Sequence, residues 1–199
     1  MKPTITFNKK EVDAQNYYYF LEGFSPEELN RIYTSVAMLP FINAGVGESS
    51  EATKEIRVSK IKWIPKDEKW LWLYEKLMNM ITEANDKLWN FDLYSMTDDI
   101  QYTEYEASEG GHYTWHQDIG PGTLSKRKVS ITVQLAGPDE YTGGDLEYWR
   151  GGDITNVEKA PKGKGVVFIF PSYMMHRVTK VETGVRKSFV LWVGGEHYK

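Results

Sequence analysis

The second half of the chain most constrains the fold, because from Phe91 onward short apolar segments alternate with turn-forming residues. Successive residues of a strand point to opposite faces. The segment 129–135 therefore predicts a strand with one apolar face and one small polar face that lines a pocket, since Val129, Ile131, Val133 and Leu135 alternate with Ser130, Thr132 and Gln134. A second segment, Val166 to Phe170, is continuously apolar and predicts a buried strand.

The remaining strands of this half are predicted from turn signals on either side. We expect residues 91–96 and 100–107 to pair with each other across 97–99, and residues 186–193 to form the last long strand. About eight short strands of this kind are typical of an antiparallel sandwich or barrel.

Two helices are predicted before these strands. Ser25 precedes Pro26 and Glu28 in a capping box, and the helix that it starts ends before Pro40. Asp67 is expected to cap a second helix that runs to about Leu88. We interpret its apolar stripe as packing against one face of the sheet rather than as cofactor contact; it comprises Trp70, Leu71, Tyr74, Leu77, Met78, Ile81 and Leu88. The whole is an α+β fold.

The other N-terminal segments are predicted more simply. Residues 1–16 indicate an arm or a first short strand, and residues 17–24 are strand-like. Residues 41–53 predict a loop, and residues 54–64 an outer strand of the major sheet. We also expect the stretch 49–54 and the adjoining strand to be mobile without substrate and to fold over the pocket.

Composition and charge exclude several classes of protein. The 199 residues favour a single domain over 1–199, with helical support and outer strands in 1–90 and the core in 91–199. The net charge is −4 without a basic block, which disfavours general nucleic-acid binding. Because cysteine is absent, a metal must be held by His and carboxylate. No apolar run resembles a signal peptide or a membrane span, so we expect a cytoplasmic protein without a membrane partner.

A metal site is predicted from His116, Asp118 and His176. His116 and Asp118 are two residues apart, so that on a strand they project together, about 6–7 Å apart. His176 follows the buried strand and is the expected third ligand. Two His and one carboxylate on one face of an octahedron form the facial triad of non-heme Fe(II) oxygenases. The alternative interpretation of His116 and Asp118 is a solvated loop pair.

His112 and His197 are alternative candidates for a metal ligand. His112 adjoins Gly111 in a predicted turn, and His197 lies near the terminus, so both are expected to be structural or exposed. The same triad also accepts zinc, manganese, cobalt or nickel. Arg186 follows His176 by ten residues and suggests a metal-bound anion with a distant carboxylate, the alternative being a surface arginine on an edge strand.

The order and spacing of these residues resemble the 2-oxoglutarate/Fe(II)-dependent dioxygenases, and within them the prolyl-4-hydroxylase-like branch. The resemblance covers roughly the C-terminal half and rests on Tyr105, Gly111-His112-Tyr113, His116-x-Asp118, Gly143-Gly144-Asp145-Leu146, Gly165 to Pro171, His176-Arg177-Val178, Gly184 to Ser188 and Trp192. It implies a double-stranded β-helix, or jelly roll, with the N-terminal helices packed on the major sheet.

The resemblance also implies roles for individual residues. Arg186 and Ser188 would bind the far carboxylate of 2-oxoglutarate, and Tyr105 and Gln134 would help to bind this cosubstrate. Tyr113, Trp192 and Arg127 would contact the substrate. For most of these side chains the alternative is ordinary core packing. Collagen-type prolyl hydroxylases often carry Lys at the position of Arg186, whereas Arg agrees with the oxygen-sensing and bacterial members.

The activity implied by the resemblance is hydroxylation of an unactivated C–H bond, with release of succinate and CO2. Fe(II), 2-oxoglutarate and O2 are required, and ascorbate is compatible as a further reductant. The first substrate class is a peptidyl prolyl residue of a peptide or protein, and the second is a free amino acid, another side chain or a small metabolite. Two other classes stay open, a non-catalytic jelly-roll binding module and a metal hydrolase or isomerase that uses the same triad.

Overall fold

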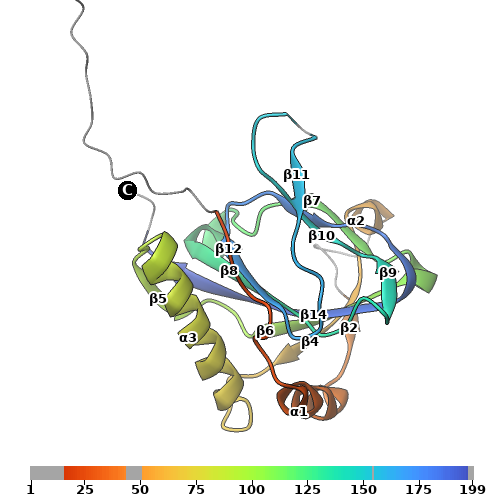
Figure 1. Ribbon diagram of the computed structural model, residues 1–199, viewed down its shortest axis with the longest axis horizontal. Coiled ribbons are helices and arrows are strands. Elements are labelled where there is room, and N and C mark those ends of the chain that lie inside the picture. Colours follow the sequence, from red (N-terminus) through yellow and green to blue (C-terminus); the bar gives the residue numbers. More distant parts are fainter. Residues whose placement is uncertain (1–15, 44–50, 154, 197–199) are drawn as a thin grey trace, which may run out of the picture.

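Two antiparallel sheets form the body of the protein, as seen in a computed structural model that describes residues 16–43, 51–153 and 155–196 (Figure 1). The larger sheet has nine strands. Its main path runs in the spatial order β1 (Tyr18–Phe20), β12 (Val167–Pro171), β8 (Arg127–Gln134), β14 (Val181–Gly195), β6 (Ile100–Glu106), β4 (Lys60–Ile64) and β2 (Ile42–Asn43), while β5 (Leu93–Met96) and β9 (Tyr141–Gly143) pair with β14 beside this path.

The smaller sheet has five strands and lies against the larger one. Its order is β11 (Val157–Lys159), β10 (Leu146–Trp149), β13 (His176–Val178), β7 (His112–His116) and β3 (Arg57–Val58). Side chains from both sheets meet in one buried cluster that includes Phe168 and Phe170 of β12 and Tyr148 of β10. The predicted jelly-roll core is therefore confirmed; the single-domain division stays a prediction.

The helices are α1 (Pro26–Ala37), α2 (Glu51–Ile56) and α3 (Leu71–Leu88), with short 3-10 turns at Ala107–Glu109 and Gly122–Lys126. The capping box of α1 is present, because the Glu28 amide donates to Ser25 Oγ at 3.3 Å and the Ser25 amide donates to the Glu28 carboxylate at 2.8 Å. No described helix has the length and apolarity that a membrane crossing requires.

The start of α3 corrects our prediction. The helix begins at Leu71, because Asp67 caps the preceding turn by accepting a hydrogen bond from the Trp70 amide at 3.2 Å. Part of the predicted stripe is also wrong, since Leu71 and Met78 are exposed, whereas Leu73, which was not included, is fully buried. The apolar face of α3 is thus rotated relative to the prediction.

The apolar core between the larger sheet and the helices α1 and α3 explains which residues of β8 and β12 are apolar. Val129, Ile131 and Val133 of β8 are fully buried against the inward faces of α1 and α3. In β12 the residues alternate between two cores, with Val167 and Ile169 facing the helices and Phe168 and Phe170 facing the smaller sheet. Because β12 is buried on both faces, its sequence is continuously apolar.

Strand pairing differs from the prediction for residues 91–107. Strand β5 pairs with β14 through Val193 and Gly194, rather than with β6. Both edges of β6 are occupied, by β4 on one side and by residues 185–190 of β14 on the other. The long β14 extends beyond β6, and this extension provides the edge that β5 uses.

The segment between α1 and α3 also differs from the prediction. Residues 41–53 contain β2 and the start of α2 rather than only a loop, and residues 54–64 contain the end of α2, then β3 and β4. The chain thus passes from the smaller sheet to the larger one between β3 and β4, and only β4 confirms the predicted outer strand. The predicted arm at 1–16 lies outside the described residues except for residue 16, and the predicted closing stretch 49–54 is described only from residue 51, where α2 begins.

Candidate active site

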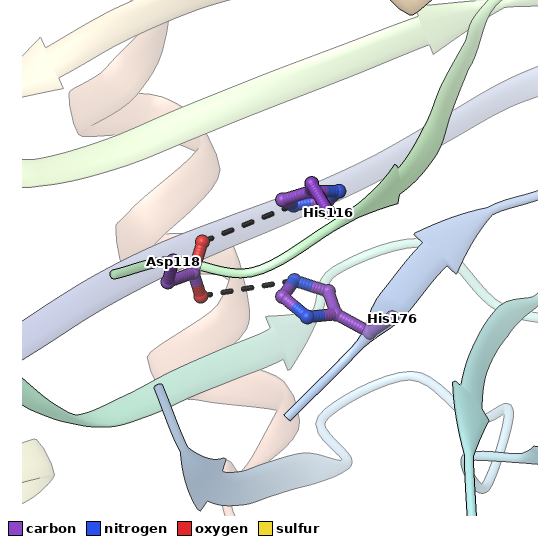
Figure 2. Close-up of side chains that lie close together, drawn as sticks. All are labelled: His116, Asp118 and His176. Atoms are coloured by element: carbon purple, nitrogen blue, oxygen red, sulfur yellow. Dashed lines mark ion pairs between the residues drawn. The ribbon is translucent and has the colours of Figure 1, made fainter. Parts of the chain in front are cut away.

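The three predicted metal ligands meet where strands β7 and β13 of the smaller sheet pair. His116 ends β7, Asp118 follows two residues later, and His176 begins β13, where it pairs directly with His116. One ligand atom from each of the three lies within 4.8 Å of the others. Figure 2 shows both imidazoles facing the Asp118 carboxylate, with Nε2 of His116 3.8 Å from Oδ1 and Nε2 of His176 3.7 Å from Oδ2.

Backbone hydrogen bonds orient both imidazoles. His116 Nδ1 lies 2.8 Å from the Thr114 carbonyl oxygen, and His176 Nδ1 lies 2.8 Å from the Met174 carbonyl oxygen. A carbonyl accepts only from a protonated nitrogen, so Nδ1 carries the hydrogen and Nε2 presents its lone pair. Two imidazole nitrogens and one carboxylate oxygen that converge in this way fit Fe(II) with open positions left for other ligands.

The charge states of the ligands suit a cation. Burial alone would raise the pKa of Asp118, but the His176 and His116 rings and a hydrogen bond from Ser130 Oγ, at 2.6 Å, hold it below its usual range. Burial, reinforced by His176, lowers the pKa of His116 to about 3. Near neutral pH His116 therefore presents a neutral imidazole and Asp118 an ionised carboxylate, which are the metal-binding forms.

The ligands line a cavity of about 320 Å³ between the two sheets. Its wall includes six other predicted site residues, namely Tyr105, Tyr113, Arg127, Arg186, Ser188 and Trp192. The even-numbered residues of β14 from 186 to 192 all face this cavity, as the strand period requires.

Arg186 is a buried cation that has no anionic partner among the described residues. Its side chain is 1% exposed, Nη1 donates to Ser188 Oγ at 2.9 Å, and Nε has no hydrogen-bond partner. Across the described ranges no carboxylate comes within 4.0 Å of its guanidinium. Since an unpaired buried charge is costly, this arrangement fits a carboxylate ligand such as the far end of 2-oxoglutarate.

A glycine makes room for Arg186. Gly144 adopts a left-handed φ of +58°, and a Cβ there would lie 3.2 Å from Arg186 Cδ and 2.9 Å from Val181 Cγ2. The bend predicted from Gly143 and Gly144 thus also permits the close approach of the arginine stem.

Aromatic side chains support the other walls. The Tyr113 ring stacks on the His116 ring with centroids 3.5 Å apart, and the Arg57 guanidinium lies 4.8 Å from the Tyr113 centroid. In the larger sheet, the Arg127 guanidinium lies 3.8 Å from the centroid of the Trp192 ring and forms an ion pair with Asp98 at 2.7 Å. Tyr105 is buried, with the Arg186 guanidinium 5.4 Å from its ring centroid.

The remaining predicted residues lie apart from the cavity. Gln134 pairs with Ser188 across the strands, but it is buried outside the cavity lining and its Oε1 has no partner. Both ring nitrogens of His112 face backbone carbonyls, those of Gly110 and Glu55, which confirms a structural role. His197 lies outside the described residues.

Several residues of the cavity lining were not predicted as site residues, among them Arg57, Trp63 and Gln101. The sequence pattern predicts a single strand of the major sheet over residues 54–64 and so does not place Arg57 at the cavity, whereas β3 belongs to the smaller sheet. The alternation of Gln101 with Tyr102 in β6 is the one sequence signal that could have placed Gln101 on the cavity side.

Comparison with known proteins supports this picture. A PKHD-type hydroxylase of Synechococcus sp. (strain CC9605) is 36% identical over 87 residues, which is 44% of this chain and 38% of the relative. A PKHD-type hydroxylase of Rippkaea orientalis (strain PCC 8801 / RF-1) is 26% identical over 177 residues, 86% of this chain and 75% of the relative. The chain spans less than half the length of the first of these relatives.

Solved structures share the fold. A prolyl hydroxylase from Trichoplax adhaerens, in complex with a peptide fragment of a hypoxia inducible factor, aligns with a TM-score of 0.73 at 20% identity, covering 90% of this chain and 84% of that one. A Pseudomonas putida prolyl-4-hydroxylase aligns with a TM-score of 0.65 at 19% identity, covering 91% and 93%. The sequence model of the 2OG-Fe(II) oxygenase superfamily matches residues 100–194. The part of the chain that matches this superfamily model is thus the part that carries the metal triad and Arg186.

Proposed function

We propose that this protein is an Fe(II)- and 2-oxoglutarate-dependent dioxygenase that hydroxylates an unactivated C–H bond, with a peptidyl prolyl residue as the first substrate class. The observation that carries the proposal is one cavity that holds both the His116, Asp118 and His176 triad and the buried, unpaired Arg186. A hydrolase or isomerase built on the same triad has no need of such a cation.

The side chains divide the work between the metal and the cosubstrate. His116 and His176 would hold Fe(II) through Nε2, and Asp118 would hold it through a carboxylate oxygen kept in place by Ser130. Arg186 would grip the far carboxylate of 2-oxoglutarate, with the Ser188 hydroxyl fixing the guanidinium. Iron and 2-oxoglutarate supply the oxidising chemistry, in which O2 is consumed, succinate and CO2 are released, and one oxygen atom enters the substrate.

The substrate side of the cavity is aromatic. Tyr113 and Trp192 form two of its walls, and a prolyl ring is a flat, apolar group that packs well against such faces. Arg127 is held over Trp192 and donates to the Asp118 backbone carbonyl at 3.3 Å, so it would define the wall rather than move with the substrate. The prolyl hydroxylases among the structural neighbours support this substrate class. The cytoplasmic location and the role of ascorbate stay predictions.

Turnover with labelled O2 tests the proposal. The protein is incubated with Fe(II), 2-oxoglutarate, ascorbate and a panel of proline-containing peptides, and the products are read by mass spectrometry. We expect one labelled oxygen atom in a peptide and a matching yield of succinate, with neither product from Asp118→Ala. Substrate conversion that is independent of O2 would indicate a hydrolase or isomerase. Absence of 2-oxoglutarate binding would indicate a non-catalytic binding module.

A further inference from the structure

Two arginines besides Arg186 reach the cavity, and they differ in how their charge is balanced. Arg127 forms an ion pair with Asp98 at 2.7 Å, so its charge is neutralised. Arg57 is half-buried in the cavity wall and takes part in no ion pair within the described part of the chain. Like Arg186, Arg57 is therefore a cation of the cavity wall that has no anionic partner among the described residues.

The Arg57 guanidinium is held in a fixed orientation. Nε donates to Ser59 Oγ at 2.8 Å, Nη2 donates to Gln101 Oε1 at 2.8 Å, and the group lies over the Tyr113 ring. Nη1 makes no hydrogen bond to any described residue. Two neutral acceptors thus orient the side chain while its charge and the Nη1 donor remain available.

Gln101 adds a second donor at the same place. It is 6% exposed, it lines the cavity, and its Oε1 is occupied by Arg57. This bond fixes the amide so that Nε2 is the free end, and Nε2 donates to no described residue. Arg57 comes from the smaller sheet and Gln101 from the larger one, so the donors approach from two sides.

This pair of donors is separate from the cosubstrate site. On β6, Tyr105 lies opposite Arg186, whereas Gln101 lies opposite Val190. Gln101 and Tyr105 are four positions apart along the strand, which corresponds to about 13 Å at the usual rise per residue. A five-carbon dicarboxylate whose far end is held by Arg186 does not extend to Gln101.

Charge balance points to the same conclusion. With Fe(II) and 2-oxoglutarate bound, the two positive charges of iron and that of Arg186 are offset by Asp118 and by the two carboxylates of the cosubstrate. The Arg127–Asp98 pair is neutral. The positive charge of Arg57 is then the one that stays unbalanced. Arg57 is close to the metal ligand His116, because the Tyr113 ring contacts both side chains.

We propose that Arg57 and Gln101 form a carboxylate-binding subsite for the substrate, so that the substrate carries a carboxylate close to the carbon that is oxidised. This inference rests on the proposed function and narrows its substrate class. The carboxylate has two sources, the free terminus of an amino acid or of a C-terminal residue, and an acidic side chain next to the target residue. A neutral, internal prolyl segment lacks the group that this subsite binds.

Binding measurements test the subsite without turnover. The full-length protein is loaded with Zn(II) and saturating 2-oxoglutarate, and ligands are titrated by calorimetry. The ligands are matched pairs: L-proline and L-prolinamide, N-acetyl-L-proline and N-acetyl-L-prolinamide, and N-acetylated, C-amidated Pro-Asp and Pro-Asn. The first two pairs report a terminal carboxylate and the third an acidic side chain. We expect the carboxylate member of at least one pair to bind about tenfold or more tightly, as for a charge-assisted hydrogen bond.

The variants separate charge from packing. Arg57→Gln should remove the preference for the carboxylate while the neutral member binds as before, and Arg57→Lys should retain part of it. The matched control is Arg31→Gln on α1, because Arg31 also lies over an aromatic ring, Trp72 at 4.3 Å, but on the exposed surface. It should leave the preference unchanged.

The outcomes distinguish this inference from the proposed function. An equal affinity of every pair, no binding of any carboxylate at the highest soluble concentration, or a full preference in Arg57→Gln would each overturn the subsite. The affinity for 2-oxoglutarate should be the same in Arg57→Gln and in the wild-type protein, and a parallel loss would assign Arg57 to the cosubstrate instead. If the carboxylate preference is found but no oxidation occurs, the subsite stands and the dioxygenase activity is refuted.

Discussion

Replacement of Arg186 by Met should abolish tight binding of 2-oxoglutarate while leaving the metal site intact. The guanidinium is 1% exposed and is held by Ser188, so its removal would leave the far carboxylate of the cosubstrate without the cation that we propose binds it. Arg186 makes no contact with the metal triad, and Fe(II) affinity should therefore stay the same.

The size of the effect follows from burial. Removing one partner of a buried, hydrogen-bonded charge pair typically costs about 3–5 kcal/mol, which corresponds to about two to four decades in affinity. Arg186→Lys keeps the charge but loses the planar fork and one charged hydrogen bond, at a cost of about 1.5–3 kcal/mol, or roughly one to two decades. The affinity for 2-oxoglutarate should thus be highest in the wild-type protein, lower in Arg186→Lys and lowest in Arg186→Met.

The ligand-free protein should respond differently. Because Arg186 is an unpaired buried cation there, its removal relieves a desolvation cost, and the unfolding temperature of the metal-loaded, ligand-free protein should not fall. Addition of 2-oxoglutarate at about a hundred times its dissociation constant stabilises a binding-competent protein by about 2.7 kcal/mol. Arg186→Met should lose this increment.

Calorimetric titration of 2-oxoglutarate into the Zn(II)-loaded protein, together with thermal unfolding with and without 2-oxoglutarate, measures both quantities. Arg31→Met on the exposed face of α1 is the control and should behave like the wild type. A dissociation constant within a few-fold of wild type in Arg186→Met would refute the assignment of Arg186 as the cosubstrate anchor, and with it the main support for the dioxygenase reading.

Three further predictions concern the metal site and the core. Alanine at His116, Asp118 or His176 should abolish Fe(II) binding and all turnover, and iron binding retained by His176→Ala in calorimetry would assign the third ligand elsewhere. Ser130→Ala removes the 2.6 Å hydrogen bond to Asp118 and should weaken Fe(II) binding by about 10–100-fold, with unchanged stoichiometry. Burial raises the pKa of Tyr74 to about 12, so the native state keeps this proton between pH 10 and 12 while the unfolded chain loses it. The free energy of unfolding should therefore fall between pH 10 and 12. Chemical denaturation at several pH values should show a smaller fall for Tyr74→Phe than for the wild-type protein, and an identical pH dependence of the two proteins would contradict the prediction.

Local interactions explain which parts of the fold the sequence predicted well. The capping box of Ser25 and Glu28 involves residues three apart, and it forms as expected. Apolar and small polar residues alternate in β8 because one face of the strand packs against the helices and the other faces the cavity. Such patterns predict an element without knowledge of its neighbours.

Contacts between distant segments explain the failures. The start of α3 was misplaced because Asp67 caps a turn and not the helix, a difference of backbone geometry that the residue type does not reveal. The partner of β5 was wrong because β4 had already occupied the free edge of β6. Arg57 was missed because its place in the smaller sheet depends on pairing with Tyr113, far along the chain.

Arg186 and Gln101, the hydrogen-bond partner of Arg57, lie on one pair of strands, β14 and β6, and this pair sets the separation between the two ends of the cavity. Arg186 pairs with Tyr105 and Val190 with Gln101 in one unbroken ladder between β14 and β6, so the distance between the ends is fixed by strand geometry and not by loops. A carboxylate at one end therefore leaves the position of the other unchanged. Substitution at Arg57, on a short edge strand, can alter substrate choice while Arg186 continues to hold the cosubstrate, because the ladder that separates them remains intact.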